Sequence, residues 1–517
     1  MNRYLIGLLG KNIAGWEILL QQEGVPYSIA PVELSGSAFS VIIVADDADA
    51  SHDSEIISYL RSGGSLLCSA VVFGRITGEK VKNEYVKYLL PETDSPFSGI
   101  WMIDIEKKCT MLKGSNYLRA QNGTPALFLD DYAGGHIAVL PFDCGTLIND
   151  VRCTSKSFMS ERSRFPHEVV STVSKGNVRR LFVRCLELLH HRRGFPYIHS
   201  WYYPQDEGSP FVLRIDTDYA SSEEVEKLYR LLCESGVNAT WFVDVKSQLD
   251  ILHIFKKMTD HEISLHCYEH KPYVNYTQVN ENIRRALGYM REHGLLPPGY
   301  ASPYGKWNYN IARAIIDNGF EYSSEFSYDY DNLPSAPWLG SGLSPVLQIP
   351  IHPVSIGTLR RQGYDEHSMQ GYYRMVINRL VAERMPVILY HHPKNGNEEV
   401  LKFVFSLVRE RNMEIRTMID IARWWKKRVQ FRFDATVIDD GLTVKGIGQN
   451  ENTRLRITRT DGLEAFTPAD IHIDLNKLQW HRSTVPDVVP KDIQRIRKFN
   501  PWIVVNRLED AVRIITK

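Results

Sequence analysis

Three short groups of acidic and histidine side chains have the residue types that bind a metal ion and move protons. One carboxylate and two imidazoles from separate segments make a ligand set that leaves positions open on a divalent metal. A second carboxylate beside them could act as a general base. The groups are Asp216 with Asp218, two residues apart, His266 with His270, four residues apart, and the adjacent His391 and His392.

These groups fall where predicted parallel strands end. Buried apolar runs alternate with helical patterns, which indicates a sheet of parallel strands with helices outside it. In such a β/α barrel the carboxyl ends of the strands converge on one face, so the three groups are expected to meet there. The predicted strands are 211–216, 239–245, 262–266, 299–302, 347–351 and 386–391.

The flanking parts predict two further domains. Residues 1–195 alternate β-branched runs such as 40–45 with helices, which predicts a flavodoxin-like layered α/β domain that resembles the glutamine amidotransferases. The cysteine of that domain, Cys68, has no flanking glycine to form a nucleophile elbow, so we interpret it as a core residue and the domain as non-catalytic. The barrel is predicted over 205–428. Residues 430–517 predict a small β-rich domain with hairpins, one of them turning at Asp440 and Gly441.

Composition excludes several partner classes. The 517 residues carry 61 Lys+Arg and 61 Asp+Glu, and this balance argues against nucleic acid as the main partner. No apolar run approaches the ~20 residues that span a bilayer. The N-terminal stretch lacks a signal cleavage site, and the seven cysteines form no Cys-x-x-Cys pair, so we expect a cytoplasmic protein. The sequence leaves the oligomeric state open.

Residues 211 to about 425 resemble the NodB-homology polysaccharide deacetylases, carbohydrate esterase family 4. The resemblance rests on three motifs: Arg-Ile-Asp-Thr-Asp at 214–218, His-Cys-Tyr-Glu-His at 266–270 and Leu-Tyr-His at 389–391. It implies a distorted seven-stranded β/α barrel that binds a divalent metal, Zn²⁺. The implied roles are general base for Asp216, metal ligand for Asp218, His266 and His270, general acid for His391, and acyl pocket for Leu389.

Two motifs depart from the family pattern. Ala301 stands where the family has an arginine that orients the base, and we hypothesise that Arg214 replaces it from the strand that carries Asp216. The fourth motif is matched only loosely. Its candidates are Asp329, Asp331 and Trp338.

The resemblance implies removal of an N-acetyl or other N-acyl group from an amino sugar or glycan precursor. Tyr304, Trp307 and His352 are candidate substrate contacts. Strand alternation favours His391 over His392 as the acid, because it shares a face with Leu389, although a bulge would reverse this choice. The alternative to an enzyme is a degenerate barrel that binds glycan without turnover, a reading that the missing arginine supports.

Overall fold

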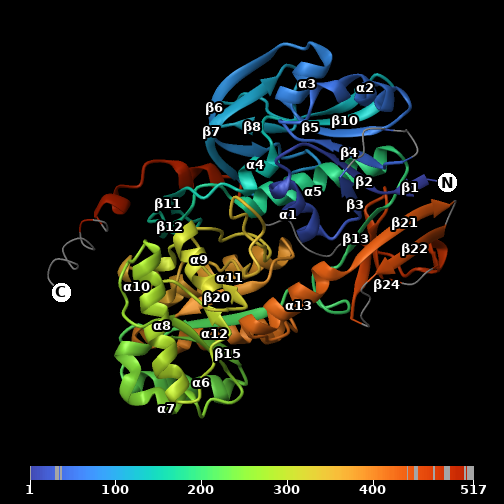
Figure 1. Ribbon diagram of the computed structural model, residues 1–517. Helices are drawn as coiled ribbons and strands as arrows, with labels where there is room; N and C mark the ends of the chain where they lie inside the picture. Colours follow the sequence, from blue (N-terminus) through green and yellow to red (C-terminus); the bar gives the residue numbers. More distant parts are fainter. Residues whose placement is uncertain are drawn as a thin grey trace.

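The protein folds into three regions of different architecture (Figure 1). The computed structural model describes residues 2–29, 34, 38–438, 441–447, 452–469, 472–482, 489–505 and 508. A layered α/β region comes first, a curled parallel sheet with outer helices follows, and two small antiparallel sheets form a β-sandwich. The predicted fold class is therefore confirmed.

The N-terminal region is built on a six-stranded sheet in which only the edge strand β9 is antiparallel. Its inner strands β4 and β5 are buried along their whole length, because helices cover both faces of the sheet. Cys68 on β5 lies in this core, as predicted. In sheet order the strands are β3 (Tyr27–Ile29), β2 (Ile6–Leu9), β4 (Val41–Val44), β5 (Ser65–Ser69), β10 (Gly135–Leu140) and β9 (Phe128–Tyr132). The helices are α1 (Ala14–Glu23), α2 (Asp53–Arg61), α3 (Ala70–Thr77), α4 (Cys144–Ile148) and α5 (Lys175–Arg192).

Two antiparallel additions extend this region. A three-stranded sheet consists of β7 (Ile103–Leu112), β6 (Val81–Pro91) and β8 (Leu118–Ala120). A separate hairpin of β11 (Cys153–Ser157) and β12 (His167–Ser171) reaches toward the barrel (Figure 1).

The barrel contains seven parallel strands in the order β19-β18-β17-β16-β15-β14-β20. The sheet curls until the segment after β19 meets β20, where the His352 N–H donates to the Ile388 carbonyl at 2.9 Å. The sequence predicts six of these strands and misses β18, because a strand of two residues carries no periodic pattern. The strands are β14 (Phe211–Asp216), β15 (Ala239–Asp244), β16 (Glu262–Cys267), β17 (Gly299–Tyr300), β18 (Tyr322–Ser323), β19 (Leu347–Gln348) and β20 (Val387–His391).

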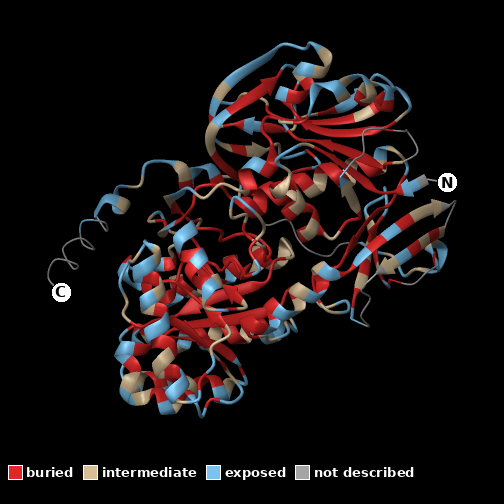
Figure 2. Cartoon of the chain, in the orientation of Figure 1, coloured by how far each residue is buried: buried red, intermediate tan, exposed pale blue. Residues whose placement is uncertain are grey.

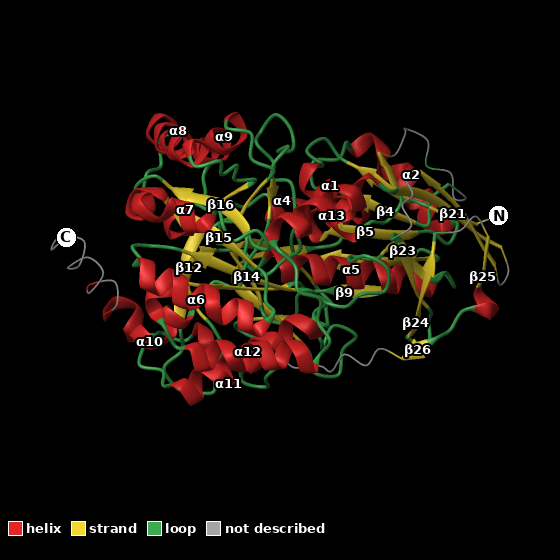
Figure 3. Cartoon of the chain, turned by 90° about the horizontal axis from the view of Figure 1, so that it is seen from below, coloured by secondary structure: helices red, strands yellow, loops and turns green. Residues whose placement is uncertain are grey.

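Amphipathic helices cover the outside of this sheet, as Figure 3 shows around β14, β15 and β16. Helix α6 begins with a capping box in which Ser221 and Glu224 bond each other's main-chain N–H groups. The helices are α6 (Ser222–Ser235), α7 (Leu252–Phe255), α8 (Tyr276–Glu292), α9 (Tyr309–Asp317), α10 (Ile356–Arg361), α11 (Glu366–Ala382), α12 (Glu398–Glu410) and α13 (Met418–Gln430). No helix among the described residues has both the length and the apolar character needed to cross a membrane.

The β-sandwich draws strands from three parts of the chain. Strand β1 comes from the N-terminus and β13 from the segment between the first two predicted domains, so the sandwich is not confined to residues after 430. The predicted turn at Asp440 and Gly441 begins outside the described residues. One sheet contains β1 (Asn2–Tyr4), β21 (Arg432–Ile438), β22 (Gly441–Ile447) and β25 (His472–Asp474). The other contains β13 (Tyr197–Ser200), β23 (Arg454–Thr458), β24 (Leu463–Pro468) and β26 (His481–Arg482).

Buried residues concentrate in the strands of the α/β region and the barrel, and they also line the contact between these two regions (Figure 2). Phe158 and Val170 of the α/β region belong to the hydrophobic core of the barrel. The two regions therefore share apolar packing.

Candidate metal centre and catalytic groups

Asp218 lies at the centre of the candidate site, two residues after the end of β14. The Nε2 atom of His266 is 3.1 Å from Asp218 Oδ1, and the Nε2 atom of His270 is 3.3 Å from Asp218 Oδ2. One ligand atom from each of the three residues lies within 4.8 Å of the others. The structure therefore brings the three predicted metal ligands together.

The surroundings of these atoms fit a divalent metal. Asp218 Oδ1 is buried and, apart from the His266 Nε2 atom 3.1 Å away, has no hydrogen-bonding partner among the described residues. The main-chain oxygen of Ala301 lies 2.6 Å from His266 Nδ1, and a hydrogen bond donated there directs the lone pair of Nε2 toward Asp218. Two ligand atoms of a tetrahedral metal with bonds of ~2.1 Å lie about 3.4 Å apart, close to the separations found here.

Asp218 is also held in its ionised form. Burial opposes ionisation, but the neighbouring His266 and His392 rings outweigh it and hold the pKa of the Asp218 carboxyl well below its usual range. An ionised carboxylate is the form that binds a metal.

Asp216 lies at the end of β14 and is clamped by Arg214 from the same strand. Arg214 donates from Nε to Asp216 Oδ1 and from Nη2 to Asp216 Oδ2, both at 2.7 Å. Its Nη1 donates to the main-chain oxygen of Ser324 at 2.8 Å, which fixes the guanidinium. Burial would raise the pKa of Asp216, but the charge of Arg214 outweighs it and the pKa lies below its usual value. The hypothesis that Arg214 substitutes for the arginine missing at Ala301 is confirmed in its geometry.

The choice of His391 over His392 is corrected by the register of β14 and β20. Ile215 is aligned with His391 and Leu213 with Leu389, so these four side chains lie on the face opposite Asp216. His391 is fully buried there. Burial lowers its pKa to about 3. The next residue, His392, instead reaches the site, with Nε2 3.5 Å from Asp218 Oδ2. Leu389 is likewise not part of the site, and Tyr390 takes the position facing it.

Two tyrosines border the cluster of Asp218, His266 and His270 at the surface. Tyr304, predicted as a substrate contact, is 51% exposed, and its ring centroid lies 4.8 Å from that of His270. Tyr219 is 55% exposed and its ring lies 5.9 Å from His270. Both have positive φ angles, 60° and 52°, a strained conformation for a residue with a side chain. Exposed aromatic rings at the edge of a polar cluster are suited to stacking on sugars. Sequence reasoning missed Tyr219, although its position directly after the Asp-Thr-Asp motif was a usable signal.

Two other predicted substrate contacts, Trp307 and His352, are buried and pack against tyrosine rings. Trp307 is buried, with its ring centroid 4.6 Å from that of Tyr328, and packs in a cluster that includes Ala312. His352 is buried with Nε2 3.0 Å from the Tyr372 hydroxyl. Their residue types suit sugar binding, but both side chains are buried in the packing of the protein.

The loosely matched fourth motif has a structural role. Asp331 accepts hydrogen bonds from the Gly176 main-chain N–H at 3.0 Å and from the Asn177 side chain at 3.3 Å, so it caps the start of α5 in the α/β region. A Cβ atom at Gly176 would lie 1.6 Å from the Asp331 carbonyl oxygen, and only glycine permits this approach. The loop that carries Asp331 joins the two regions and does not enter the site.

Comparison with known proteins adds a family match for one part of the chain. Residues 205–323 match the family model for polysaccharide deacetylase. No curated protein matches the chain.

Three solved structures with a similar region each cover less than half of the chain. A structure from Mycobacterium smegmatis, described as a polysaccharide deacetylase, has 17% identity and a TM-score of 0.38, and covers 43% of this chain and 92% of its own. One from Pseudomonas aeruginosa, described in the same way, has 18% identity and a TM-score of 0.36, and covers 42% and 91%. A structure described as Puue allantoinase has 17% identity and a TM-score of 0.36, and covers 42% and 89%. The segment that carries Asp216, Asp218, His266 and His270 is thus similar to the polysaccharide deacetylases, as its motifs predict.

Proposed function

We propose that this protein is a metal-dependent hydrolase that removes an N-acyl group, such as acetyl, from an amino sugar or a glycan precursor. The observation that carries the proposal is the convergence of Asp218, His266 and His270 beside a carboxylate, Asp216, that Arg214 fixes. The family match of residues 205–323 supports deacetylation of a carbohydrate.

Asp218, His266 and His270 would hold the metal, and two imidazoles with one carboxylate suit Zn²⁺ with open positions. A metal at this site supplies a water of lowered pKa and a positive charge for the acyl oxygen. Asp216 accepts the proton of the attacking water, and the clamp from Arg214 keeps its carboxylate oriented during this transfer.

His392 donates the proton that the departing amine needs. Its Nε2 lies 3.5 Å from Asp218, on the side of the site opposite β16. The main-chain N–H of Tyr304, beside His270, stabilises the negative charge on the acyl oxygen. The rings of Tyr304 and Tyr219 stack on the sugar.

The test has two arms on the purified full-length protein. Elemental mass spectrometry should find about one Zn²⁺ per chain. Incubation with N-acetylated glucosamine oligomers should then release acetate. A protein that binds Zn²⁺ and the oligomers but releases no acetate would favour a glycan-binding barrel. A protein that takes up no metal even after Zn²⁺ is added would refute the hydrolase.

A further inference from the structure

The peptide group between Ala301 and Ser302 joins a candidate metal ligand to a buried carboxylate. Its carbonyl oxygen lies 2.6 Å from His266 Nδ1. Since a carbonyl oxygen can only accept, the imidazole donates this bond and Nδ1 carries the proton. The N–H of the same peptide group donates to Glu325 Oε1 at 3.1 Å. Two hydrogen bonds in series therefore connect Glu325 to the imidazole whose other nitrogen faces Asp218.

Glu325 is fully buried, and the main chain around it is held by hydrogen bonds. Gln348 of β19 donates to the Glu325 carbonyl at 3.2 Å. The preceding residue, Ser324, donates from its N–H to the Tyr300 carbonyl at 3.1 Å. The carboxylate of Glu325 is therefore presented to the Ser302 N–H from a fixed backbone.

The same short segment after β18 also supports the proposed general base. The Ser324 carbonyl accepts from Arg214 Nη1 at 2.8 Å, and Arg214 clamps Asp216 with its two other nitrogens. One residue further along, Glu325 supports His266 through the peptide group described above. Two adjacent residues thus fix the surroundings of both the base and a metal ligand.

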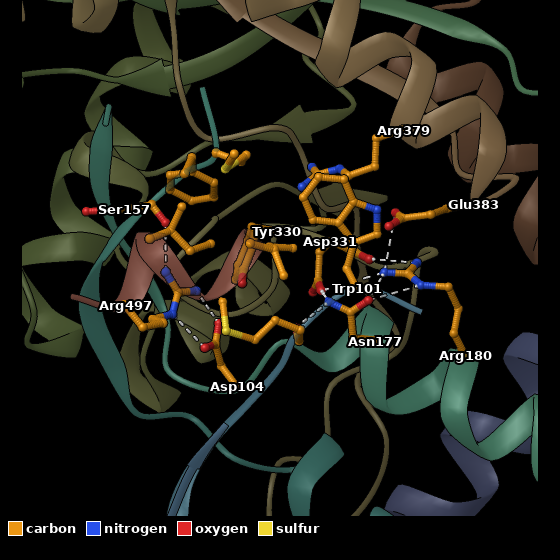
Figure 4. A pocket seen from close by; sticks show the side chains of 15 residues that line it. Trp101, Asp104, Ser157, Asn177, Arg180, Tyr330, Asp331, Arg379, Glu383 and Arg497 are labelled. Carbon is orange, nitrogen blue, oxygen red and sulfur yellow. Dashed lines mark hydrogen bonds and ion pairs between the residues drawn. The ribbon is translucent and has the colours of Figure 1, made fainter. Parts of the chain in front are cut away.

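The α/β region anchors the far end of the loop that carries Glu325. Asp331 of this loop accepts from the Asn177 side chain at 3.3 Å and lies 3.9 Å from Arg180 Nη2. Figure 4 shows these three side chains together, with Asn177 and Arg180 projecting from α5. The loop is therefore held between the barrel and the α/β region.

The hydrogen bonds on the two sides of the Ala301–Ser302 peptide influence each other. A carboxylate that accepts from the N–H polarises the peptide group and strengthens the bond at its carbonyl. A histidine that donates a stronger hydrogen bond from one nitrogen is a better metal ligand through the other. Burial raises the pKa of Glu325 to about 7, so most of its carboxyl is ionised at pH 8.

We propose that Glu325 is a positioning residue for the metal centre, and that it orients and strengthens the ligand His266 through the Ala301–Ser302 peptide group. This inference rests on the proposed function, which assigns His266 as a metal ligand. It gives a task in the site to a residue that touches neither metal nor substrate.

The test measures the dissociation constant for Zn²⁺ at pH 8, by competition with a chromophoric chelator. The full-length protein is compared with Glu325→Met, which has a similar length but no oxygen acceptor, and with Glu325→Gln, which keeps a neutral one. Glu262→Met is the matched control. Glu262 is a buried carboxylate of the same barrel that accepts from Thr240 and Ser264, but at the start of β16, away from His266.

Loss of an outer-shell partner is expected to weaken Zn²⁺ binding about tenfold in Glu325→Met. Glu325→Gln should lose roughly threefold, because a neutral acceptor forms the weaker hydrogen bond. This variant also removes a buried charge, which favours the folded state, so its weaker binding would not come from loss of stability. Glu262→Met should bind Zn²⁺ like the wild type.

Equal dissociation constants for Glu325→Gln and the wild type would overturn the inference, even if Glu325→Met did not fold. An equal loss in Glu262→Met would overturn it too, because the effect would then follow the stability of the barrel. Acetate release from N-acetylated glucosamine oligomers at saturating Zn²⁺ tests the hydrolase separately. If Zn²⁺ affinity responds to Glu325 but the wild type releases no acetate, the hydrolase proposal fails while the positioning role stands.

Discussion

The barrel carries two pairs of buried aspartates whose surroundings differ. Asp216 ends β14 and Asp218 lies two residues later, and the Asp218 oxygens face the imidazole nitrogens of His266 and His270. Asp329 and Asp331 follow β18 and face the α/β region. There the main-chain N–H of Gly176 and the side chain of Asn332 donate to them.

The difference shows what distinguishes a reactive carboxylate from a structural one. Both pairs are buried and both lie near cations, so burial and charge alone do not separate them. In the second pair amide groups occupy the carboxylate oxygens, and Lys175 lies over the ring of Tyr328, 3.6 Å from its centroid. In the first pair Arg214 bonds both oxygens of Asp216, whereas the oxygens of Asp218 face imidazole nitrogens of His266 and His270. Carboxylates with open lone pairs that converge with imidazoles are suited to bind a metal.

The largest effect is expected from removing the two imidazoles that face Asp218. In His266→Ala/His270→Ala two of the three metal ligands are lost. We expect loss of Zn²⁺ and a decrease in acetate release of at least about 10³-fold, because the charge at the acyl oxygen disappears. Elemental analysis and an acetate assay measure the two effects.

A matched double variant, His253→Ala/His367→Ala, removes two exposed histidines outside the site. It should keep both metal and activity. Retention of stoichiometric Zn²⁺ by His266→Ala/His270→Ala would show that the metal binds elsewhere.

The second effect concerns two adjacent histidines, His391 at the end of β20 and His392 directly after it. His392→Ala should lower kcat by about 10²-fold while metal content is unchanged, since a general acid contributes roughly that much. His391→Ala should leave kcat near the wild-type value and lower the unfolding temperature, because His391 is buried on the other face. Loss of metal in His392→Ala would instead make His392 a ligand. The reverse pattern of kcat values would restore His391 as the acid.

The sequence predicts some strands of the fold and misses others. The strands 211–216 and 262–266 are predicted almost to the residue, because each carries apolar residues of the core and ends in polar groups. β18 is missed, since a strand of two residues gives no pattern. Local sequence does not predict which strands form the sandwich, because β1 and β13 pair with strands that follow the barrel.

The site was predictable where a motif alone brings its residues together. Asp218, His266 and His270 need only the ends of two strands to meet. His392 needs the register of β20 against β14, and a shift of one residue exchanges the faces. Trp307 is a candidate by residue type and His352 by its place after a strand, and neither criterion shows whether an aromatic side chain packs in a core. The contact between Arg214 and Asp216 could be predicted, because the two residues share one strand face.

Glu325 is a third kind of buried carboxylate, because only one of its two oxygens is hydrogen-bonded. Its Oε1 accepts from the Ser302 N–H at 3.1 Å, while its Oε2 is buried with no partner among the described residues. Burial raises its pKa from the ordinary 4.5 to about 7. Between these two values the folded protein keeps a proton that the unfolded chain has lost, so this contribution to stability falls as the pH rises through 7.

Glu325→Gln cannot ionise and should escape this loss. We expect it to be more stable than the wild type by up to about 3 kcal/mol at pH 8–9, with little difference below pH 4.5. Urea unfolding at several pH values measures the difference. A constant difference across the whole range would mean that Glu325 does not titrate between these limits.

The smallest effect is expected from the second pair. Asp331→Ala removes the cap of α5 and leaves the Gly176 N–H buried, which should lower the free energy of unfolding by about 2 kcal/mol. Asp365→Ala is the matched control, since Asp365 caps α11 at the surface through the Ser368 N–H and joins no second region. Its cost should be smaller than that of Asp331→Ala. Because Asp331 lies outside the site, kcat for acetate release should be unchanged in both variants. A large fall in kcat for Asp331→Ala at full metal content would assign it to the catalytic machinery, and the distinction between bonded and open carboxylates would then fail.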